Sequence, residues 1–74
     1  MQLSEQIKNI RQRAFLSQEK YAKELDVSIS TVIRWENGKS CPNLTAMKKI
    51  KDFCKKYELP FNDIEEEWFK LKEN

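Results

Sequence analysis

The sequence predicts an all-α fold of five short helices. Apolar residues recur at intervals of three and four along most of the chain, the spacing that places side chains on one face of a helix. One glycine and two prolines among 74 residues argue against both β-hairpins and a disordered chain. A chain of this length buries only a modest core, so we expect one compact domain over residues 1–74.

The first two helices are predicted from apolar spacing and from a capping residue. The first covers about Leu3 to Arg13. Its apolar residues, spaced by four, three and four, are Leu3, Ile7, Ile10 and Ala14. The second helix begins after Ser17, whose hydroxyl can accept a hydrogen bond from a backbone N–H of the first turn, and it runs to about Leu25.

A third helix is predicted from Ser28 to Asn37, ending at Gly38, because serine favours helix starts and glycine favours the left-handed residue past a helix end. The apolar positions of the second and third helices cannot belong to one straight helix. The polar break at residues 26–28 separates them, and Asp26 adopts the left-handed conformation more easily than most residues. Two short helices joined in this way form a helix-turn-helix, whose second helix enters the DNA major groove. Sequence-specific DNA binding is therefore the leading prediction.

The fourth helix begins after Asn43, a second capping residue, and runs to about Tyr57. The residues that its spacing predicts to face inward are Leu44, Met47, Ile50, Cys54 and Tyr57.

The fifth helix covers about residues 62–72, after Pro60 has broken the chain. Asn62 and Glu65 match a capping box at its start. One apolar stripe contains Ile64, Trp68 and Leu71, whereas Phe69 points elsewhere.

Positive charge is concentrated in one part of the chain. The net charge is only +2, but residues 1–57 hold 12 Lys and Arg against 6 Asp and Glu, and residues 58–74 hold 2 against 6. The balances of +6 and −4 place the positive charge beside the predicted helix-turn-helix. This polarity favours a polyanion as partner, although two ordinary solvated faces would have the same composition.

Several other function classes lack the residues they need. The chain has no histidine, and Cys41 and Cys54 are too few for a four-ligand zinc site. No glycine-rich phosphate loop and no nucleophile–base pair appears, so we expect no enzyme activity, no cofactor, no metal and no small-molecule ligand. Neither a membrane span nor a signal peptide is indicated, so we expect a cytoplasmic protein with reduced thiols; redox sensing by Cys41 is a minor alternative.

A set of residues around the predicted helix-turn-helix matches a known pattern in register. It comprises Leu16-Ser17-Gln18-Glu19, Ala22, Leu25, Val27-Ser28, Thr31, Val32, Arg34-Trp35-Glu36-Asn37-Gly38-Lys39, Pro42, Leu44, Met47 and Ile50. With these residues, the stretch from 7 to 64 resembles the lambda-repressor-like family, which includes Cro and many small bacterial and phage regulators. The resemblance implies a compact five-helix DNA-binding domain and a transcriptional regulator, with repression as the expected direction.

The chain departs from this family in three places. Asp26 stands in the turn where the family usually has glycine, and Phe15 stands where it often has glycine or asparagine. Both departures carry some backbone cost. Ile29 and Ile33 replace residues that are often polar in the family, so hydrogen-bonded base recognition is not expected at these two positions.

The resemblance implies which side chains face the bases. These are Ser28, Ile29, Ser30 and Arg34. Arg34 is the strongest candidate, because its planar guanidinium can pair with O6 and N7 of guanine, the alternative being a phosphate contact. Ile29 can pack on the methyl group of thymine. Ser28 could act purely as an N-cap, and Ile33 is left open between the DNA face and the core.

A second group is expected to contact phosphates. Gln18 begins the second helix where the family commonly uses glutamine to touch a phosphate and to brace the recognition helix. The other candidates are Ser17, Thr31, Asn37 and Lys39. Arg11 and Glu36 resemble a structural pair that joins the first helix to the end of the third.

Two expectations concern protein partners. One recognition helix covers few bases, so we expect a homodimer on an inverted repeat of operator DNA, with Trp68 and Phe69 as the candidate interface. The main alternative function is a protein-interaction module on the same fold, such as an antitoxin or an antirepressor-like phage protein. The apolar surface of the fifth helix keeps this alternative open. The operator sequence and the regulated genes are not determined by the sequence.

Overall fold

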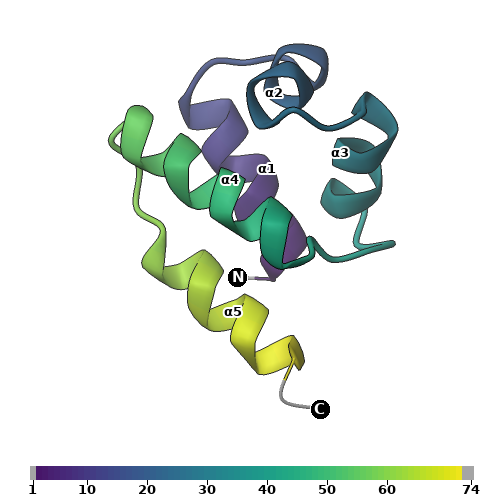
Figure 1. The fold of residues 1–74 in the computed structure, drawn as a ribbon, viewed down its shortest axis with the longest axis vertical. Helices are drawn as coiled ribbons and strands as arrows, with labels where there is room; N and C mark the ends of the chain where they lie inside the picture. Colours follow the sequence, from purple (N-terminus) through teal and green to yellow (C-terminus); the bar gives the residue numbers. More distant parts are fainter. Residues whose placement is uncertain (1, 73–74) are drawn as a thin grey trace.

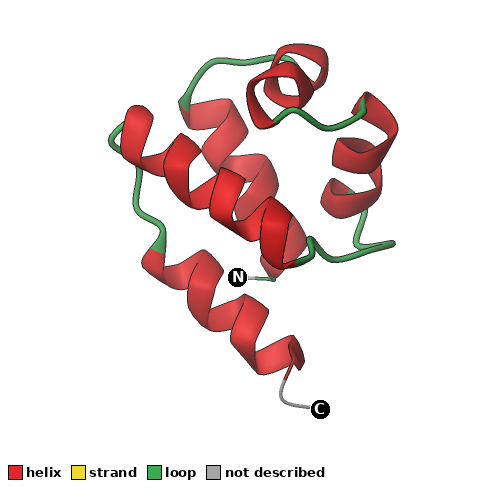
Figure 2. Ribbon diagram, viewed as in Figure 1, coloured by secondary structure: helices red, strands yellow, loops and turns green. Residues whose placement is uncertain are grey.

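The computed structural model describes residues 2–72, which form five helices joined by loops (Figure 1). The helices are α1 (Leu3–Arg13), α2 (Gln18–Leu25), α3 (Ile29–Glu36), α4 (Leu44–Lys56) and α5 (Asn62–Lys72). Figure 2 shows no strand in this part of the chain, so the predicted all-α fold is confirmed. No helix within the described range is long and apolar enough to cross a membrane.

The helices are arranged so that α3 lies at the edge of the molecule. α2 packs against both α3 and α4, while α1 contacts α3 and α5. In Figure 1, α2 and α3 stand at the top and right, α5 lies at the bottom, and α1 and α4 occupy the space between them. One side of α3 is therefore turned away from the other helices.

The core collects apolar side chains from all five helices. They are Leu3, Ile7, Ile10, Tyr21, Ala22, Leu25, Val32, Trp35, Ala46, Met47, Ile50, Phe53, Cys54, Ile64 and Trp68. Tyr21 is fully buried; its hydroxyl donates to the Ile7 carbonyl at 3.0 Å, and its ring packs edge-on against Phe53. Burial raises the pKa of Tyr21, so the phenol remains a neutral donor inside the core. Each large apolar side chain buried in this way contributes roughly 1.5–3 kcal/mol to stability.

Three predicted helix starts are confirmed by capping hydrogen bonds. Ser17 Oγ accepts from the backbone N–H of Lys20 at 3.2 Å, and Ser28 Oγ accepts from that of Thr31 at 3.1 Å. Asn43 Oδ1 accepts from the backbone N–H of Ala46 at 2.8 Å. These bonds satisfy backbone donors that have no partner within the helix.

The predicted capping box at the start of α5 is wrong. Asn62 already lies inside the helix, and the carbonyl of Phe61, one residue earlier, accepts from the N–H of Glu65 at 3.0 Å. No hydrogen bond within residues 2–72 uses the Asn62 side chain as a cap. The chain therefore enters α5 one residue before the position that the sequence pattern indicates.

Four helices end in the same hydrogen-bonded turn, with one residue in the left-handed conformation. After α1, the Leu16 N–H donates to the Arg11 carbonyl at 3.2 Å and the Phe15 N–H to that of Gln12 at 3.0 Å. The left-handed residues after α1, α2, α3 and α4 are Phe15, Asp26, Gly38 and Glu58. The left-handed conformation predicted for Asp26 is confirmed, with φ at +55°.

Only Gly38 of these four adopts the left-handed conformation without strain. For the other three residues this conformation costs roughly 1–2 kcal/mol each, least for Asp26, because the Cβ atom approaches the following carbonyl oxygen. Burial of the following residue offsets part of the cost. Leu16, Val27 and Leu59 occupy these positions, and all three pack against the core.

The inward faces of α4 and α5 differ in part from the predicted ones. Leu44 is 61% exposed and Leu71 is 48% exposed, so neither belongs to the core. Each lies in a terminal turn, at the end of its helix. The buried side of α4 also includes Ala46 and Phe53, which the predicted apolar stripe omitted. Phe53 is buried because it packs against Tyr21 of α2.

Candidate nucleic-acid interface

One face of α3 is buried and the opposite face is open. Val32 and Trp35 are buried against the other helices. Ser28, Ser30 and Arg34 are exposed, Ile29 is 42% exposed and Ile33 is 37% exposed. The predicted exposure of Ile29 is confirmed, and Ile33 belongs to the open face with part of its side chain covered. The four predicted base-contacting residues therefore share one accessible surface.

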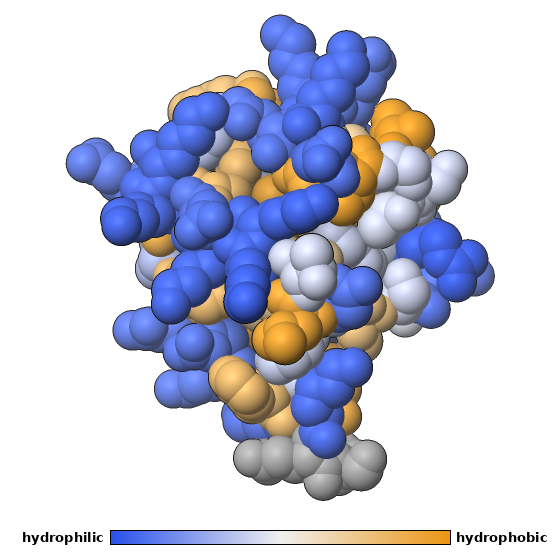
Figure 3. Space-filling view, viewed as in Figure 1, coloured by the Kyte–Doolittle hydropathy of each residue, from blue (hydrophilic) through white to orange (hydrophobic). Residues whose placement is uncertain are grey.

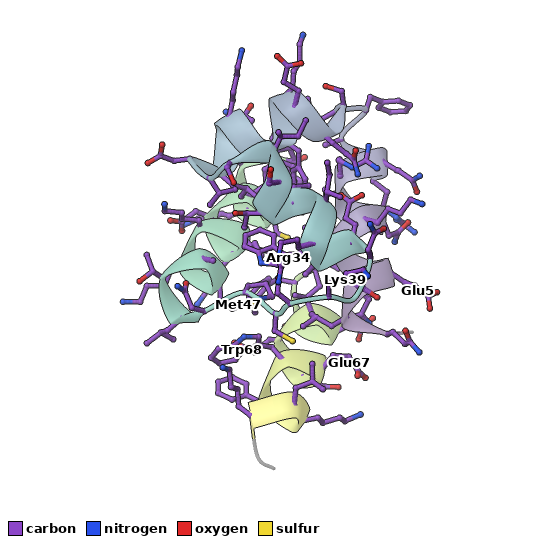
Figure 4. All side chains as sticks on the ribbon, turned by 90° about the vertical axis from the view of Figure 1, so that its right-hand side faces the viewer. Glu5, Arg34, Lys39, Met47, Glu67 and Trp68 are labelled. Carbon is purple, nitrogen blue, oxygen red and sulfur yellow. The ribbon has the colours of Figure 1, made fainter. Side chains whose placement is uncertain are left out.

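The guanidinium of Arg34 is free to meet a ligand. None of the hydrogen bonds or ion pairs within residues 2–72 involves it, and the same holds for the ammonium group of Lys39. Figure 4, viewed from the side of α3, shows Arg34 on this helix and Lys39 in the loop that follows it. Two exposed cations without a partner in residues 2–72 thus lie at one end of the open face.

A buried ionic network holds the C-terminal end of α3. Arg11 donates from Nε and Nη2 to the Glu36 carboxylate, at 2.8 and 3.0 Å, and from Nη1 to the Leu16 carbonyl at 3.0 Å. Gln18 Nε2 donates to the same carboxylate at 3.1 Å. The side chains of Arg11 and Glu36 are only 13% and 2% exposed. The hydrogen bonds to Glu36 raise the pKa of Arg11, so the guanidinium stays charged.

This network confirms the predicted pair of Arg11 and Glu36 and the bracing role predicted for Gln18. It connects the end of α1, the loop after it, the start of α2 and the last residue of α3. Because a bidentate arginine–carboxylate contact is directional, it fixes the orientation of α3 as well as its distance from α1.

The residues predicted to contact phosphates lie at the start of α2, on α3 and just after α3. Ser17, Asn37 and Lys39 are exposed, while Gln18 and Thr31 are half-buried. In the free protein the hydroxyls of Ser28 and Thr31 lie 2.8 Å apart and share a hydrogen bond. The capping role predicted for Ser28 is therefore confirmed, and its hydroxyl already has two partners within the chain.

Two further polar contacts join α2 and the turn after it to α4, and the sequence did not predict either. Lys49 of α4 donates to the carbonyl of Asp26 at 3.3 Å and lies 3.8 Å from its carboxylate. Glu24 of α2 accepts from the hydroxyl of Tyr57 at 2.6 Å and from Lys56 at 3.0 Å. The hydrogen bond from Tyr57 lowers the pKa of Glu24. α4 contains several lysines, and nothing in the sequence distinguishes Lys49 and Lys56 as the ones that contact α2 and its turn.

Trp68 is a core residue. Its side chain is buried, and its Nε1–H donates to the carbonyl of Pro42 at 2.7 Å. This bond ties α5 to the loop between α3 and α4. Of the two residues predicted for a dimer interface, Trp68 has little free surface, whereas Phe69 is 51% exposed.

No cluster of three or more histidine, cysteine or acidic side chains that could hold a metal ion occurs within residues 2–72. Cys41 is exposed in the loop after α3, and Cys54 is buried in the core. Burial raises the pKa of the Cys54 thiol to about 11, so this residue behaves as a small apolar core side chain.

The comparisons with known proteins agree with this geometry. A helix-turn-helix family model matches residues 7–60. The chain is also similar to the HTH-type transcriptional activator BcrR of Enterococcus faecalis, with 36% identity over 53 residues. That match covers 72% of this chain and 26% of the relative, so the chain spans about a quarter of that protein. No solved structure matches the chain significantly. The chain belongs to the helix-turn-helix family of Cro and phage-repressor type.

Proposed function

We propose that the protein is a sequence-specific DNA-binding regulator of transcription that inserts α3 into the major groove. The observation that supports this most is the open face of α3, which combines an unpaired arginine with small polar and apolar side chains on a rigidly held helix. The helix-turn-helix family match supports DNA as the partner.

Base recognition falls to the residues on the open face. Arg34 pairs with guanine through its planar guanidinium, and Ile29 contacts a thymine methyl group. Ser30 is free to bond a base edge, whereas Ser28 must exchange its contact with Thr31 to do so. Specificity thus rests mainly on one arginine and one isoleucine for each recognition helix.

Phosphate contacts orient α3 in the groove. Ser17 and Gln18 lie at the start of α2, and Thr31, Asn37 and Lys39 lie along α3 and just after it. Backbone N–H groups at the starts of the two helices add donors for phosphate oxygens. The charge balance of +6 over residues 1–57 strengthens this attraction at long range.

The functional unit is a homodimer. One recognition helix contacts too few base pairs for useful specificity, and a two-fold dimer doubles the site, with half-sites about 34 Å apart. Phe69 of α5 remains exposed beside Leu44 of α4, and the two side chains offer the apolar surface for the second copy. Trp68 supports this surface from beneath and is not itself exposed.

The proposed direction of regulation is repression, by occupying promoter DNA in the cytoplasm. The relative from Enterococcus faecalis is named an activator, so the direction needs its own measurement. A reporter gene placed behind the selected operator decides between the two. Lower expression in the presence of the protein supports repression, and higher expression shows activation.

The test of DNA recognition compares two variants, one that removes an arginine and one that removes a lysine. The protein is titrated into two DNA duplexes, and binding is followed by fluorescence anisotropy. One duplex is selected by the wild-type protein from a random pool, and the other has a scrambled sequence. Arg34→Ala should weaken binding to the selected duplex by about 1–3 kcal/mol and relax the preference at one position of each half-site. Lys39→Ala should weaken binding to both duplexes alike and reduce the slope of affinity against salt. If wild-type protein selects no sequence, the proposal is wrong.

A protein-interaction module remains the second candidate, and one observation favours it. Figure 3 shows apolar atoms at the surface where α4 and α5 meet, on a face that is otherwise mostly hydrophilic. Leu44 of α4 and Phe69 of α5 line one shallow hollow between these helices, and both are more than half exposed. A protein that fails to select DNA but forms a stable complex with a different protein would favour this candidate.

A further inference from the structure

Phe15 is the most exposed of the large apolar side chains within residues 2–72. It lies in the turn between α1 and α2, its φ is +59°, and it is 94% exposed. A backbone in the left-handed conformation is strained for an aromatic residue. A phenyl ring that stays exposed also contributes no free energy of burial to folding. The turn itself would form with less strain around glycine. Neither folding nor solubility therefore accounts for a phenylalanine at this position.

The equivalent residues after the other helices show the contrast. Asp26 and Glu58 have nearly the same φ angles, +55° and +57°, and both have charged side chains that water solvates well. Asp26 is also paired with Lys49. Within residues 2–72, only Phe15 combines a strained backbone with an exposed apolar side chain, a combination that suggests a role in binding.

The position of Phe15 is fixed relative to the recognition helix. The carbonyl of the next residue, Leu16, accepts from Arg11, and the same guanidinium holds Glu36 at the end of α3. Two residues after Phe15, Ser17 caps α2, and Gln18 donates to Glu36. The ring therefore projects from a rigid part of the chain, next to the start of α2.

The surroundings of Phe15 match the chemistry of a DNA backbone. Arg13, two residues earlier, is an exposed cation, and the start of α2 presents backbone N–H groups and the Ser17 hydroxyl. These groups suit phosphate oxygens. The apolar face of a phenyl ring suits the deoxyribose between two phosphates, and aromatic rings beside basic residues are a recurring feature of nucleic-acid-binding surfaces.

We propose that Phe15 is an additional DNA-contacting residue that packs against a deoxyribose of the backbone just outside each half-site. This inference rests on the proposed function, because it requires the start of α2 to face the DNA. The contact touches no base edge, so it adds affinity for every sequence equally. It also neutralises no phosphate, so it leaves the salt dependence of binding unchanged.

The decisive variant is Phe15→Gly, which separates folding from binding. Glycine relieves the strain of the left-handed backbone, so the melting temperature should stay the same or rise. DNA affinity should nevertheless fall roughly fivefold to tenfold, for selected and scrambled duplexes alike, because an apolar contact is lost. The slope of log affinity against log salt should not change, in contrast to the slope for Lys39→Ala.

Two further variants and two duplexes sharpen the experiment. Phe15→Tyr keeps the ring and should bind as the wild type does, while Phe15→Asn tolerates the left-handed backbone and should bind as Phe15→Gly does. Glu58→Gly is the matched control, since it relieves the same strain at the end of α4 and should not weaken binding. The loss in Phe15→Gly should appear on a duplex with flanking base pairs and vanish on one that ends at the half-sites.

The possible outcomes separate this inference from the proposed function. If the wild-type protein selects no DNA, the proposed function fails and the inference fails with it. If the wild-type protein binds its selected duplex and a folded Phe15→Gly variant binds equally well, only the assignment of Phe15 is wrong. A variant with normal DNA affinity but a shifted monomer–dimer equilibrium by sedimentation would assign Phe15 to a protein contact instead, which also overturns the inference.

Discussion

Both ends of the molecule pack apolar side chains, but directional polar contacts between helices are concentrated at one of them. At the end formed by α2 and α3, directional polar contacts cross between helices, through Arg11 and Glu36 and through Glu24 and Tyr57. At the α5 end, apolar packing dominates, with the indole bond of Trp68 as one directional contact. A helix that is proposed to meet base edges needs a fixed orientation, which ion pairs and hydrogen bonds supply. A helix that mainly completes the core can rely on non-directional burial.

The largest expected effect comes from breaking the network at the α3 end. Glu36→Ala leaves the guanidinium of Arg11 largely buried without a carboxylate and removes the partner of Gln18. We expect the free energy of unfolding to fall by about 3 kcal/mol, because an uncompensated buried charge is costly. Urea unfolding measured by circular dichroism at low temperature gives this value.

A double variant serves as the control for this prediction. Arg11→Met combined with Glu36→Leu removes both charges and should recover much of the lost stability. If Glu36→Ala destabilises no more than Glu67→Ala, which removes a carboxylate paired with Lys70 on α5, then directional contacts do not distinguish the two ends of the molecule.

The second prediction concerns the hydrogen bond that ties α5 to the loop before α4, at the opposite end. Trp68→Phe keeps most of the apolar volume but leaves the Pro42 carbonyl without its donor. We expect a loss of about 1–2 kcal/mol in the free energy of unfolding, with little change in DNA affinity. Thermal melting and anisotropy titration on the same samples test both parts. A large loss of affinity in a variant of normal stability would show that α5 controls the DNA-binding face.

A smaller effect on stability is expected on the open face of α3. Ile29→Gln changes an exposed side chain, so the free energy of unfolding should shift by about 0.5 kcal/mol or less. The preferred base at one operator position should change, with thymine losing its advantage, since glutamine prefers adenine. Selection from a random pool measures the preference. A large drop in melting temperature, or an unchanged preference, would remove Ile29 from the proposed interface.

The smallest effect is a pH dependence of the contact between α2 and α4. Tyr57 and Lys56 lower the pKa of Glu24 below its ordinary 4.5 in the folded protein. The contribution of Glu24 to stability is therefore present above pH 4.5 and is lost as the pH falls through the lowered value. Glu24→Gln should lose less stability than the wild type on acidification below pH 4.5. Urea unfolding at a series of pH values gives the difference, and identical curves for the two proteins would contradict the prediction.

The comparison of the two ends also shows which features could be predicted. Helix bounds, the caps at Ser17, Ser28 and Asn43, and the left-handed residue at Asp26 followed from the sequence. The family resemblance added the pair of Arg11 and Glu36. The assignments of base and phosphate contacts remain predictions, and so does the dimer.

Local signals predicted most features that depend on residues close together in the sequence. The caps at Ser17, Ser28 and Asn43 join residues three apart, and the left-handed ends at Asp26 and Gly38 close bonds over five residues or fewer, so the sequence by itself determined them. The left-handed residues Phe15 and Glu58 and the start of α5 were not predicted, because their side chains are not typical of these positions. The burial of Phe53 rather than Leu44, the bond between Trp68 and Pro42, and the contact of Lys49 with Asp26 were decided only by the tertiary structure. Each of these depends on how two helices distant in sequence are placed. A periodic pattern defines which side of a helix is apolar, but the crossing of its neighbours decides how much of that side is covered.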